Sequence, residues 1–336
     1  MRYISFLIVN IISVVLATTQ SKSLVIDKDG INTLFDVSPS KNYIIYGKNL
    51  KGFDSGDYIE GQVFIFNRLT NSSELLNKDT LEISSTFFKW GKNDNTLFFS
   101  DGKIIYYISI DNEIVVKPIY IPESEYMHID NFFISNSDKK IACWISNNNP
   151  NDATKNLVII DLESISHKTI YSVKNEWLPE SVKSVAAWIN DDSIVYINMY
   201  GDLFQSNLLK EKIVHLRDSV KTDFLKVKDD FVFYSSNNKL LLYNLKDQHE
   251  KVILESTNLN INYLTVNIDN SMVLSFNDKL MYYDGDKAIA NVLHTSDLNA
   301  KVVYCDSKLF IEEVVNNSKK VILLYKLSVD NVETPN

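Results

Sequence analysis

The chain is built from short apolar runs separated by polar turns, and one arrangement of runs and turns recurs along most of its length. Each repeat begins with an apolar or aromatic residue, passes through a turn rich in Asp, Asn, Ser or Lys, and enters an apolar run. A second apolar run follows after another turn. Runs of this length between turn residues predict β-strands, and the two runs of each unit predict neighbouring antiparallel strands.

Seven copies of this unit are present. Their first segments begin at Phe35, Phe88, Phe133, Ala187, Phe224, Thr265 and Val302. Successive units recur at roughly 40 to 55 residues, the length of one four-stranded propeller blade. We therefore predict an all-β fold: a single β-propeller of seven four-stranded blades over residues 23–330. A two-sheet sandwich is the alternative, but it would not produce seven similar units.

The sequence also predicts how the ring closes and whether a second domain is present. The segment SLVIDKDG from Ser23 is expected to supply the outer strand that closes the ring against the last blade. One weak helical pattern, Glu176 to Ser184, is interrupted by Pro179. A second, α/β domain is therefore not expected.

The first residues predict a signal peptide over residues 1–19. Arg2 precedes an apolar run over residues 4–16, and small residues follow at positions 17–19. An uncleaved membrane anchor is the alternative, but the run is shorter than the roughly 20 apolar residues that a span needs. We expect a secreted or extracytoplasmic protein, in a periplasm, a lumen or the cell exterior, with no membrane span after cleavage.

Composition narrows the classes of partner. The formal net charge is −9 and no dense basic run occurs, which argues against nucleic acid, because affinity for phosphates needs clustered Lys and Arg. Cys143 and Cys305 are expected to be buried free thiols, with a disulfide as the alternative. Asn71 and Asn316 lie in Asn-x-Ser sequences and are glycosylation acceptors if the source is eukaryotic.

The turn sequences resemble those of two propeller families. The stretches FDVSPSKNYIIYG from Phe35 and FKWGKNDNTLFFSDGKIIYYISID from Phe88 resemble TolB-like propellers and the N-terminal propeller of the dipeptidyl-peptidase IV family. Ser38-Pro39-Ser40-Lys41 is most similar to the Ser-Pro-Asp-Gly-Lys turn of those families, and later units keep the turn character without the Pro. The resemblance implies a propeller, and the α/β-hydrolase domain of the peptidases is not present in this sequence.

Motifs for catalysis or metal binding are missing from the sequence. No Gly-x-Ser-x-Gly nucleophile elbow occurs, and the five histidines lack zinc-ligand spacing. The pairs Asp191-Asp192 and Asp229-Asp230 occupy turns between strands, where Asp commonly hydrogen-bonds its own backbone. We therefore predict no catalytic residue, no cofactor and no metal ligand.

Two long polar segments are the predicted contact surface. They are KGFDSGDYIE from Lys51 and NNNPNDATKN from Asn147, each longer than an ordinary hairpin loop. In the first, the candidate binding residues are Phe53, Asp54, Asp57 and Tyr58, with the two aromatic side chains as anchors.

A glutamate pair adds two further candidates. The peptidase resemblance implies a pair that holds a substrate amine, and Glu123 and Glu125 are the candidates for it, with a solvated loop as the alternative.

These observations predict a non-enzymatic, extracytoplasmic propeller that binds a protein or peptide partner through its rim loops. The alternative is a propeller enzyme, a hydrolase or lyase with its residues brought together in the central funnel, with or without a metal. His, Asp or Glu side chains converging on the innermost strands would favour the enzyme, and an apolar or plugged funnel would count against it. Glycan binding and a degenerate peptidase relative are further alternatives.

Overall fold

The structure is a computed structural model. It describes residues 21–23, 33–40, 42–52, 59–76, 81–83, 88–110, 114–174, 184–220, 222, 224–255, 261–266, 272–276, 279–284, 289–295, 302–305, 308–315 and 319–326. All regular secondary structure in these residues is β-strand. They include no helix that could span a membrane. The predicted signal peptide and residues 176–183 of the weak helical pattern lie outside the described residues.

The strands follow in chain order. The first eleven are β1 (Ser21–Ser23), β2 (Thr33–Val37), β3 (Tyr43–Gly52), β4 (Ile59–Asn67), β5 (Ser72–Leu75), β6 (Leu81–Ile83), β7 (Phe88–Trp90), β8 (Thr96–Ser100), β9 (Ile105–Ile110), β10 (Ile114–Tyr120) and β11 (Met127–Ile134). The next nine are β12 (Lys140–Asn147), β13 (Thr154–Asp161), β14 (Ser166–Lys174), β15 (Ala186–Asn190), β16 (Ser193–Ile197), β17 (Leu203–Asn207), β18 (Lys212–Arg217), β19 (Leu225–Lys228) and β20 (Phe231–Ser236). The last nine are β21 (Lys239–Asn244), β22 (Glu250–Glu255), β23 (Ile261–Val266), β24 (Met272–Phe276), β25 (Lys279–Asp284), β26 (Ile289–Thr295), β27 (Val302–Cys305), β28 (Lys308–Val315) and β29 (Lys319–Lys326).

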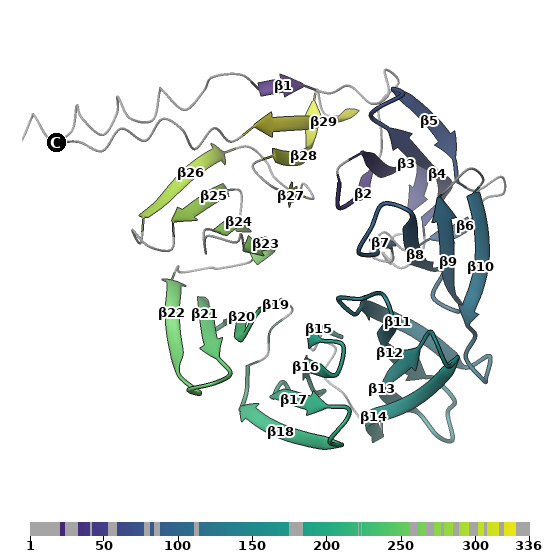
Figure 1. Ribbon diagram of the computed structural model, residues 1–336, viewed down its shortest axis with the longest axis vertical. Coiled ribbons are helices and arrows are strands. Elements are labelled where there is room, and N and C mark those ends of the chain that lie inside the picture. The colour runs from purple at the N-terminus through teal and green to yellow at the C-terminus, as the bar shows by residue number, and fades with distance from the viewer. Residues whose placement is uncertain are drawn as a thin grey trace, which may run out of the picture.

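These strands form antiparallel sheets that surround a common centre, as in a β-propeller (Figure 1). Blade 1 holds β2 to β5 with β6 paired to β4; blades 2 to 6 hold β7–β10, β11–β14, β15–β18, β19–β22 and β23–β26; the last described blade holds β27–β29 and β1. The first strand of each blade is nearest the centre and the fourth lies at the rim (Figure 1). The predicted all-β propeller is confirmed, and every repeat unit read from the sequence corresponds to the first three strands of a blade.

The N-terminal strand closes the ring. β1 pairs antiparallel with β29, with Ser21 opposite Tyr325 and Ser23 opposite Leu323, and it is the outermost strand of the last blade. The closing strand therefore lies two residues earlier than the segment predicted from Ser23. Filling this position covers the outer edge of β29, which would otherwise present unpaired backbone groups.

The hydrophobic core lies between neighbouring blades. Middle strands are covered on both faces, so all five residues of β8 and all five of β16 are buried. This accounts for the continuous apolar runs in the sequence, since a strand covered on both faces need not alternate with polar residues. The largest described cluster spans blades 3 to 5 and includes Trp144, Trp188 and Tyr234.

Two tryptophans connect blades 3 and 4 in opposite directions. The buried Trp144 indole on β12 donates its Nε1–H to the carbonyl oxygen of Val185 in the next blade, at 3.3 Å. The Trp188 indole on β15 donates in return to the carbonyl oxygen of Phe133 on β11, at 2.9 Å. Each indole thus buries a large apolar surface and satisfies its one polar group across the same seam.

Aspartates in the turns between first and second strands connect the blades as well. Asp94 accepts from the backbone N–H of Ser40, Asp138 from that of Lys92, and Asp191 from that of Ser137, each in the preceding blade. The expectation that Asp191 hydrogen-bonds its own turn is therefore wrong. That role belongs to Asn190, which accepts from the backbone N–H of Asp192. Asp192 instead pairs with Lys140 of blade 3.

The outermost strands share a β-bulge at equivalent positions. In β10, β14, β18, β22 and β26 the pairing with the third strand shifts by one residue. In β18 the shift places Arg217 opposite Leu203 and His215 opposite Phe204, so Leu216 is the extra residue. A bulge increases local twist and redirects the side chains next to it. In blade 4 these redirected side chains belong to the site described below.

Candidate functional site

The structure describes only part of the predicted contact surface. Phe53, Asp54, Asp57 and Tyr58 lie outside the described residues, and so does Asn316. The flanking strands reach further than predicted, because Gly52 pairs with Ile59 and Lys51 with Glu60, which leaves residues 53–58 between β3 and β4. The second predicted loop is a hairpin connection at residues 148–153, with Asn147 paired to Thr154.

The predicted glutamate pair lies on the connection between β10 and β11. Glu123 is 75% exposed and its Oε1 lies 3.5 Å from His167 Nε2 on β14. Glu125 is exposed as well. Asn71 is exposed in the turn between β4 and β5, so its side chain is accessible.

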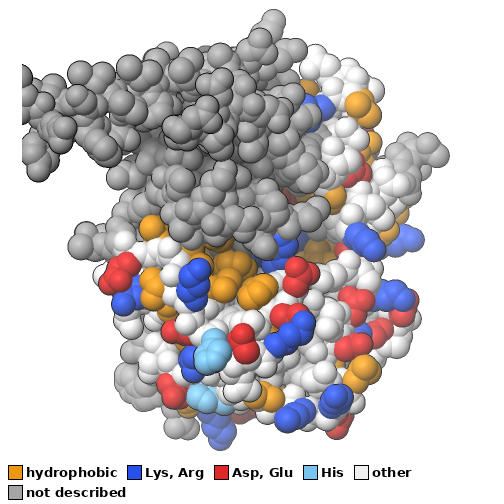
Figure 2. Space-filling model, turned by 60° about the vertical axis from the view of Figure 1, so that its left-hand side comes forward, with side chains coloured by type: hydrophobic (Ala, Val, Ile, Leu, Met, Phe, Trp, Pro, Cys, Tyr) orange, Lys and Arg blue, Asp and Glu red, His pale blue; other side chains and the backbone are white. Residues whose placement is uncertain are grey.

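A groove lies at the rim where β18 ends beside blade 5. Its volume is about 380 Å³. It is lined by Arg217, Asp218, Ser219, Val220, Tyr234, Ser236, Asn237, Lys239, Leu241, Glu250 and Val252. Charged side chains of both signs surround exposed hydrophobic ones on this side of the molecule (Figure 2). A smaller groove of about 210 Å³ lies at the seam between blades 3 and 4 and includes Ile213.

One wall of the larger groove is a connected set of aromatic and charged groups. The Arg217 Nε–H donates to Glu250 Oε2 at 3.3 Å, and the guanidinium lies 4.9 Å from the ring centroid of Tyr243. The Tyr234 hydroxyl donates to the same Glu250 oxygen. Burial, with a further contribution from Glu250, raises the pKa of the Tyr234 phenol above its ordinary value, so this hydroxyl remains a donor at neutral pH.

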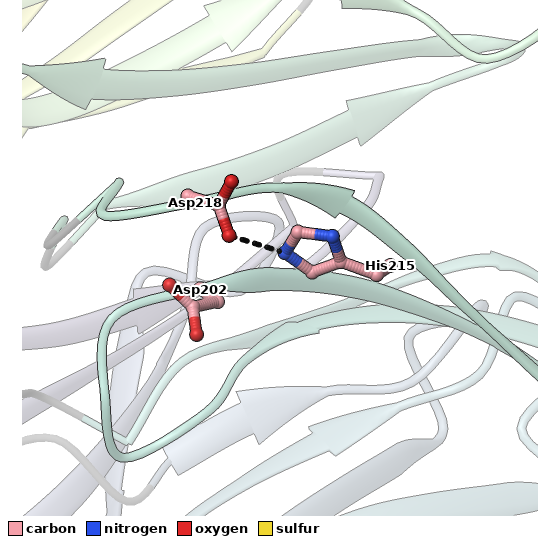
Figure 3. A group of neighbouring side chains, drawn as sticks. All are labelled: Asp202, His215 and Asp218. Atoms are coloured by element: carbon pink, nitrogen blue, oxygen red, sulfur yellow. Dashed lines mark ion pairs between the residues drawn. The ribbon is translucent and has the colours of Figure 1, made fainter.

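Three potential metal ligands meet beside this groove (Figure 3). Asp202 lies in the turn between β16 and β17, His215 on β18, and Asp218 directly after β18. Their ligand atoms all lie within 4.8 Å of one another. His215 Nε2 lies 3.1 Å from Asp218 Oδ1, and Asp202 accepts from the backbone N–H of Ser219 at 2.8 Å.

Sequence reasoning missed this group. The zinc-ligand spacings that the histidines lack are short sequence motifs, whereas this group comes from one blade and the connection after it. The available signal was His215 three residues before Asp218 near the end of an outer strand. The position of Asp202 beside them depends on strand register, which the sequence does not display.

Charged residues also lie on the innermost strands. Lys226, on the innermost strand β19, keeps solvent-exposed surface, yet the protein that surrounds its ammonium group desolvates it and lowers its pKa. Lys89 on β7 lowers this pKa further, and Asp36 on β2 acts in the opposite direction. Strands β19 and β7 belong to blades on different sides of the ring (Figure 1), so Lys89 acts on Lys226 from another blade. The Nζ of Lys228, also on β19, is buried without a hydrogen-bond partner.

Comparisons with known proteins support the fold. No protein-family model and no curated protein sequence matches the chain. Among solved structures, oligogalacturonate lyase in complex with manganese has a TM-score of 0.69 at 12% identity, over 93% of this chain and 94% of that one.

Two peptidase structures are similar as well. The β-propeller domain of the Trilobed protease from Pyrococcus furiosus has a TM-score of 0.58 at 13% identity, over 88% of this chain and 95% of that one. Dipeptidyl peptidase 4 from Porphyromonas gingivalis has a TM-score of 0.57 at 11% identity, over 88% of this chain and 51% of that one. The resemblance to dipeptidyl-peptidase-type propellers is thus confirmed as a resemblance of fold.

Proposed function

We propose that this chain is an extracytoplasmic, non-enzymatic propeller that binds an extended segment of a protein or peptide partner at its rim. The observation that carries the proposal is the groove between β18 and blade 5. The walls of the groove belong to blades 4 and 5, which share one hydrophobic core cluster. The lining combines charged, polar and aliphatic side chains. Binding residues are commonly placed on rigid scaffolds in this way.

The groove has the composition of a recognition site. Arg and Tyr are enriched among residues that dominate binding energies, and here Arg217 and Tyr234 are oriented by Glu250 before a partner arrives. A side chain that is already ordered loses less conformational entropy on binding. Leu241 and Val252 add apolar surface for a partner side chain.

The size of the groove and its neighbouring strand favour an extended segment. A volume of about 380 Å³ accommodates a few side chains rather than a folded domain. The groove adjoins β22, the outermost strand of blade 5, whose outer edge has no paired strand among the described residues. Peptides commonly bind by adding a strand to such an edge while alternate side chains enter pockets. In the last blade the chain itself does this with β1.

A display selection with matched variants tests the proposal. Random dodecapeptides are selected on the full chain, and the enriched peptides are measured against Val252→Glu and Ile213→Glu. Val252 is 45% exposed on β22 in the larger groove, and Ile213 is 49% exposed on β18 in the smaller groove. We expect Val252→Glu to weaken binding about tenfold or more, because it places a charge on an apolar contact, and Ile213→Glu to leave it unchanged. No enrichment, or an equal loss in both variants, would contradict the proposal.

A second candidate function is a propeller enzyme with its site at the ring axis. The specific observation is the lowered pKa of Lys226 beside Lys89, since perturbed pKa values gather at catalytic sites and lysines attract anionic substrates. The test substrate is oligogalacturonate, the acidic sugar in the name of one structurally similar enzyme. Activity that is present in the full chain and lost in Lys226→Met, with the fold intact by circular dichroism, would favour the enzyme. Inactivity toward this substrate leaves the binding proposal in front.

A further inference from the structure

We propose that Asp202, His215 and Asp218 bind one divalent transition-metal ion at the rim of blade 4. The inference is independent of the partner proposed above, because it concerns a cation held by the chain alone. It rests on three side chains that provide one imidazole and two carboxylates: Asp202 from the turn between β16 and β17, and His215 and Asp218 from β18 and the residue after it (Figure 3).

The spacing suits a single ion after a small adjustment. Zinc–nitrogen and zinc–oxygen bonds are about 2.0 to 2.2 Å long, so two ligand atoms of one ion lie at most about 4.4 Å apart. The three ligand atoms lie within 4.8 Å of one another. Asp218 is 84% exposed, so its carboxylate can rotate toward the other two ligands when an ion binds.

Two of the ligands are held in place by contacts outside the group. Asp202 accepts from the Ser219 backbone N–H, and its own backbone N–H donates to Asn198 Oδ1 at 2.8 Å, so both the turn and the carboxylate are oriented. The His215 ring packs on Phe204, with ring centroids 5.0 Å apart. Oriented ligands of this kind raise metal affinity, because less freedom is lost on binding.

An ion pair alone explains only part of this geometry. The contact of His215 with Asp218 needs no third residue, yet Asp202 arrives from a different hairpin. Two carboxylates and one imidazole leave the group negatively charged. The neighbouring cation Arg217 is directed away, toward Glu250 and the Tyr243 ring. A bound cation would supply the missing positive charge.

The ligand types select the class of metal. Imidazole with carboxylates suits zinc, manganese, cobalt or nickel, whereas calcium and magnesium prefer oxygen ligands alone. Three protein ligands leave coordination positions open for water or for a carboxylate from outside the chain. Since Asp218 also lines the larger groove, an open position would face it.

Cobalt titration of the full chain tests the inference. The protein is first treated with EDTA and desalted, and Co²⁺ is then added while its d–d absorption is followed, with Zn²⁺ competition to obtain the affinity. We expect one bound ion per chain and a loss of affinity of about tenfold or more in His215→Ala and in Asp218→Asn. Asp218→Asn is the variant that keeps the fold, because the side chain is exposed.

The matched control is His167→Ala. His167 also faces a carboxylate, Glu123, at 3.5 Å, but it is not part of the three-ligand group found in the described residues. Its substitution should leave Co²⁺ binding unchanged. The inference is overturned if the d–d absorption stays that of aqueous Co²⁺, or if His215→Ala and His167→Ala bind Co²⁺ with the same affinity as the unsubstituted chain. Because no partner is present, these outcomes do not depend on the peptide-binding proposal.

Discussion

Replacing Trp188 measures how much one contact between blades 3 and 4 contributes to the free energy of unfolding. Its side chain is 6% exposed in the seam between blades 3 and 4, and its Nε1–H donates to the Phe133 carbonyl at 2.9 Å. Trp188→Phe keeps an aromatic ring but removes two ring carbons and the N–H donor. The substitution therefore separates this seam contact from the rest of the sheet.

The expected loss of stability can be worked from these contacts. At about 0.8 kcal/mol per buried CH₂-sized group, the two carbons contribute about 1.6 kcal/mol. The lost hydrogen bond adds about 1 kcal/mol. We therefore expect Trp188→Phe to lower the free energy of unfolding by about 2.5 kcal/mol, which corresponds to a decrease in Tm of roughly 5 °C.

Trp90→Phe is the matched comparison. The Trp90 Nε1 is buried without a hydrogen-bond partner, so replacing the indole removes an unsatisfied donor as well as two carbons. The two effects have opposite signs, and the stability should remain within about 1 kcal/mol of the unsubstituted chain. Unfolding in urea followed by far-ultraviolet circular dichroism measures both variants. Equal destabilisation of the two would refute the assignment of the Trp188 hydrogen bond to the seam.

Three further outcomes are expected. Burial raises the pKa of Tyr120 and of Tyr196 to about 12. Their contribution to the free energy of unfolding is therefore present below pH 10 and is lost as the pH rises toward 12. The midpoint of urea unfolding should fall between pH 10 and 12, and a constant midpoint would contradict this. The thiol of Cys143 is buried, and that burial raises its pKa. With the other cysteine replaced by serine, Cys143 should react with a disulfide reagent only after denaturation. Rapid labelling of the native chain would count against the fold at β12. Gly91→Ala would place a Cβ 2.6 Å from Asp138 Oδ2 and displace that carboxylate from its contact between blades. The free energy of unfolding should therefore fall by about 1 kcal/mol. Unchanged stability would show that the contact contributes little.

Sequence patterning was sufficient for the fold because the repeat is a local signal. A turn such as Ser38-Pro39-Ser40 and the apolar run after it are encoded within about a dozen residues, and both recur in each blade. Even the closing strand was foreseeable, since one short segment remained before the first unit. Only its position differed, by two residues.

The candidate sites were not predictable, because they depend on register and on contacts between blades. Arg217 and Glu250 meet across a seam although they lie 33 positions apart in the chain. His215 lies opposite Phe204 because of a bulge in β18, and a one-residue difference in pairing has no signature in a single sequence. The turn aspartates illustrate the same limit. Their positions were recognised, but the partner of Asp191 in the preceding blade depends on how the blades are rotated.

The strand that closes the ring also sets the order in which the molecule can be completed during synthesis. β1 is among the first described residues to leave the ribosome, and its partner β29 is made roughly 300 residues later. Until then the earlier blades can stack on one another, but β1 has no sheet to join. Chain growth at about 5 to 20 residues per second makes this interval roughly 15 to 60 seconds. A nascent chain stalled before β29 would therefore hold an open ring and a free strand, the species from which exchange of β1 between two copies can begin.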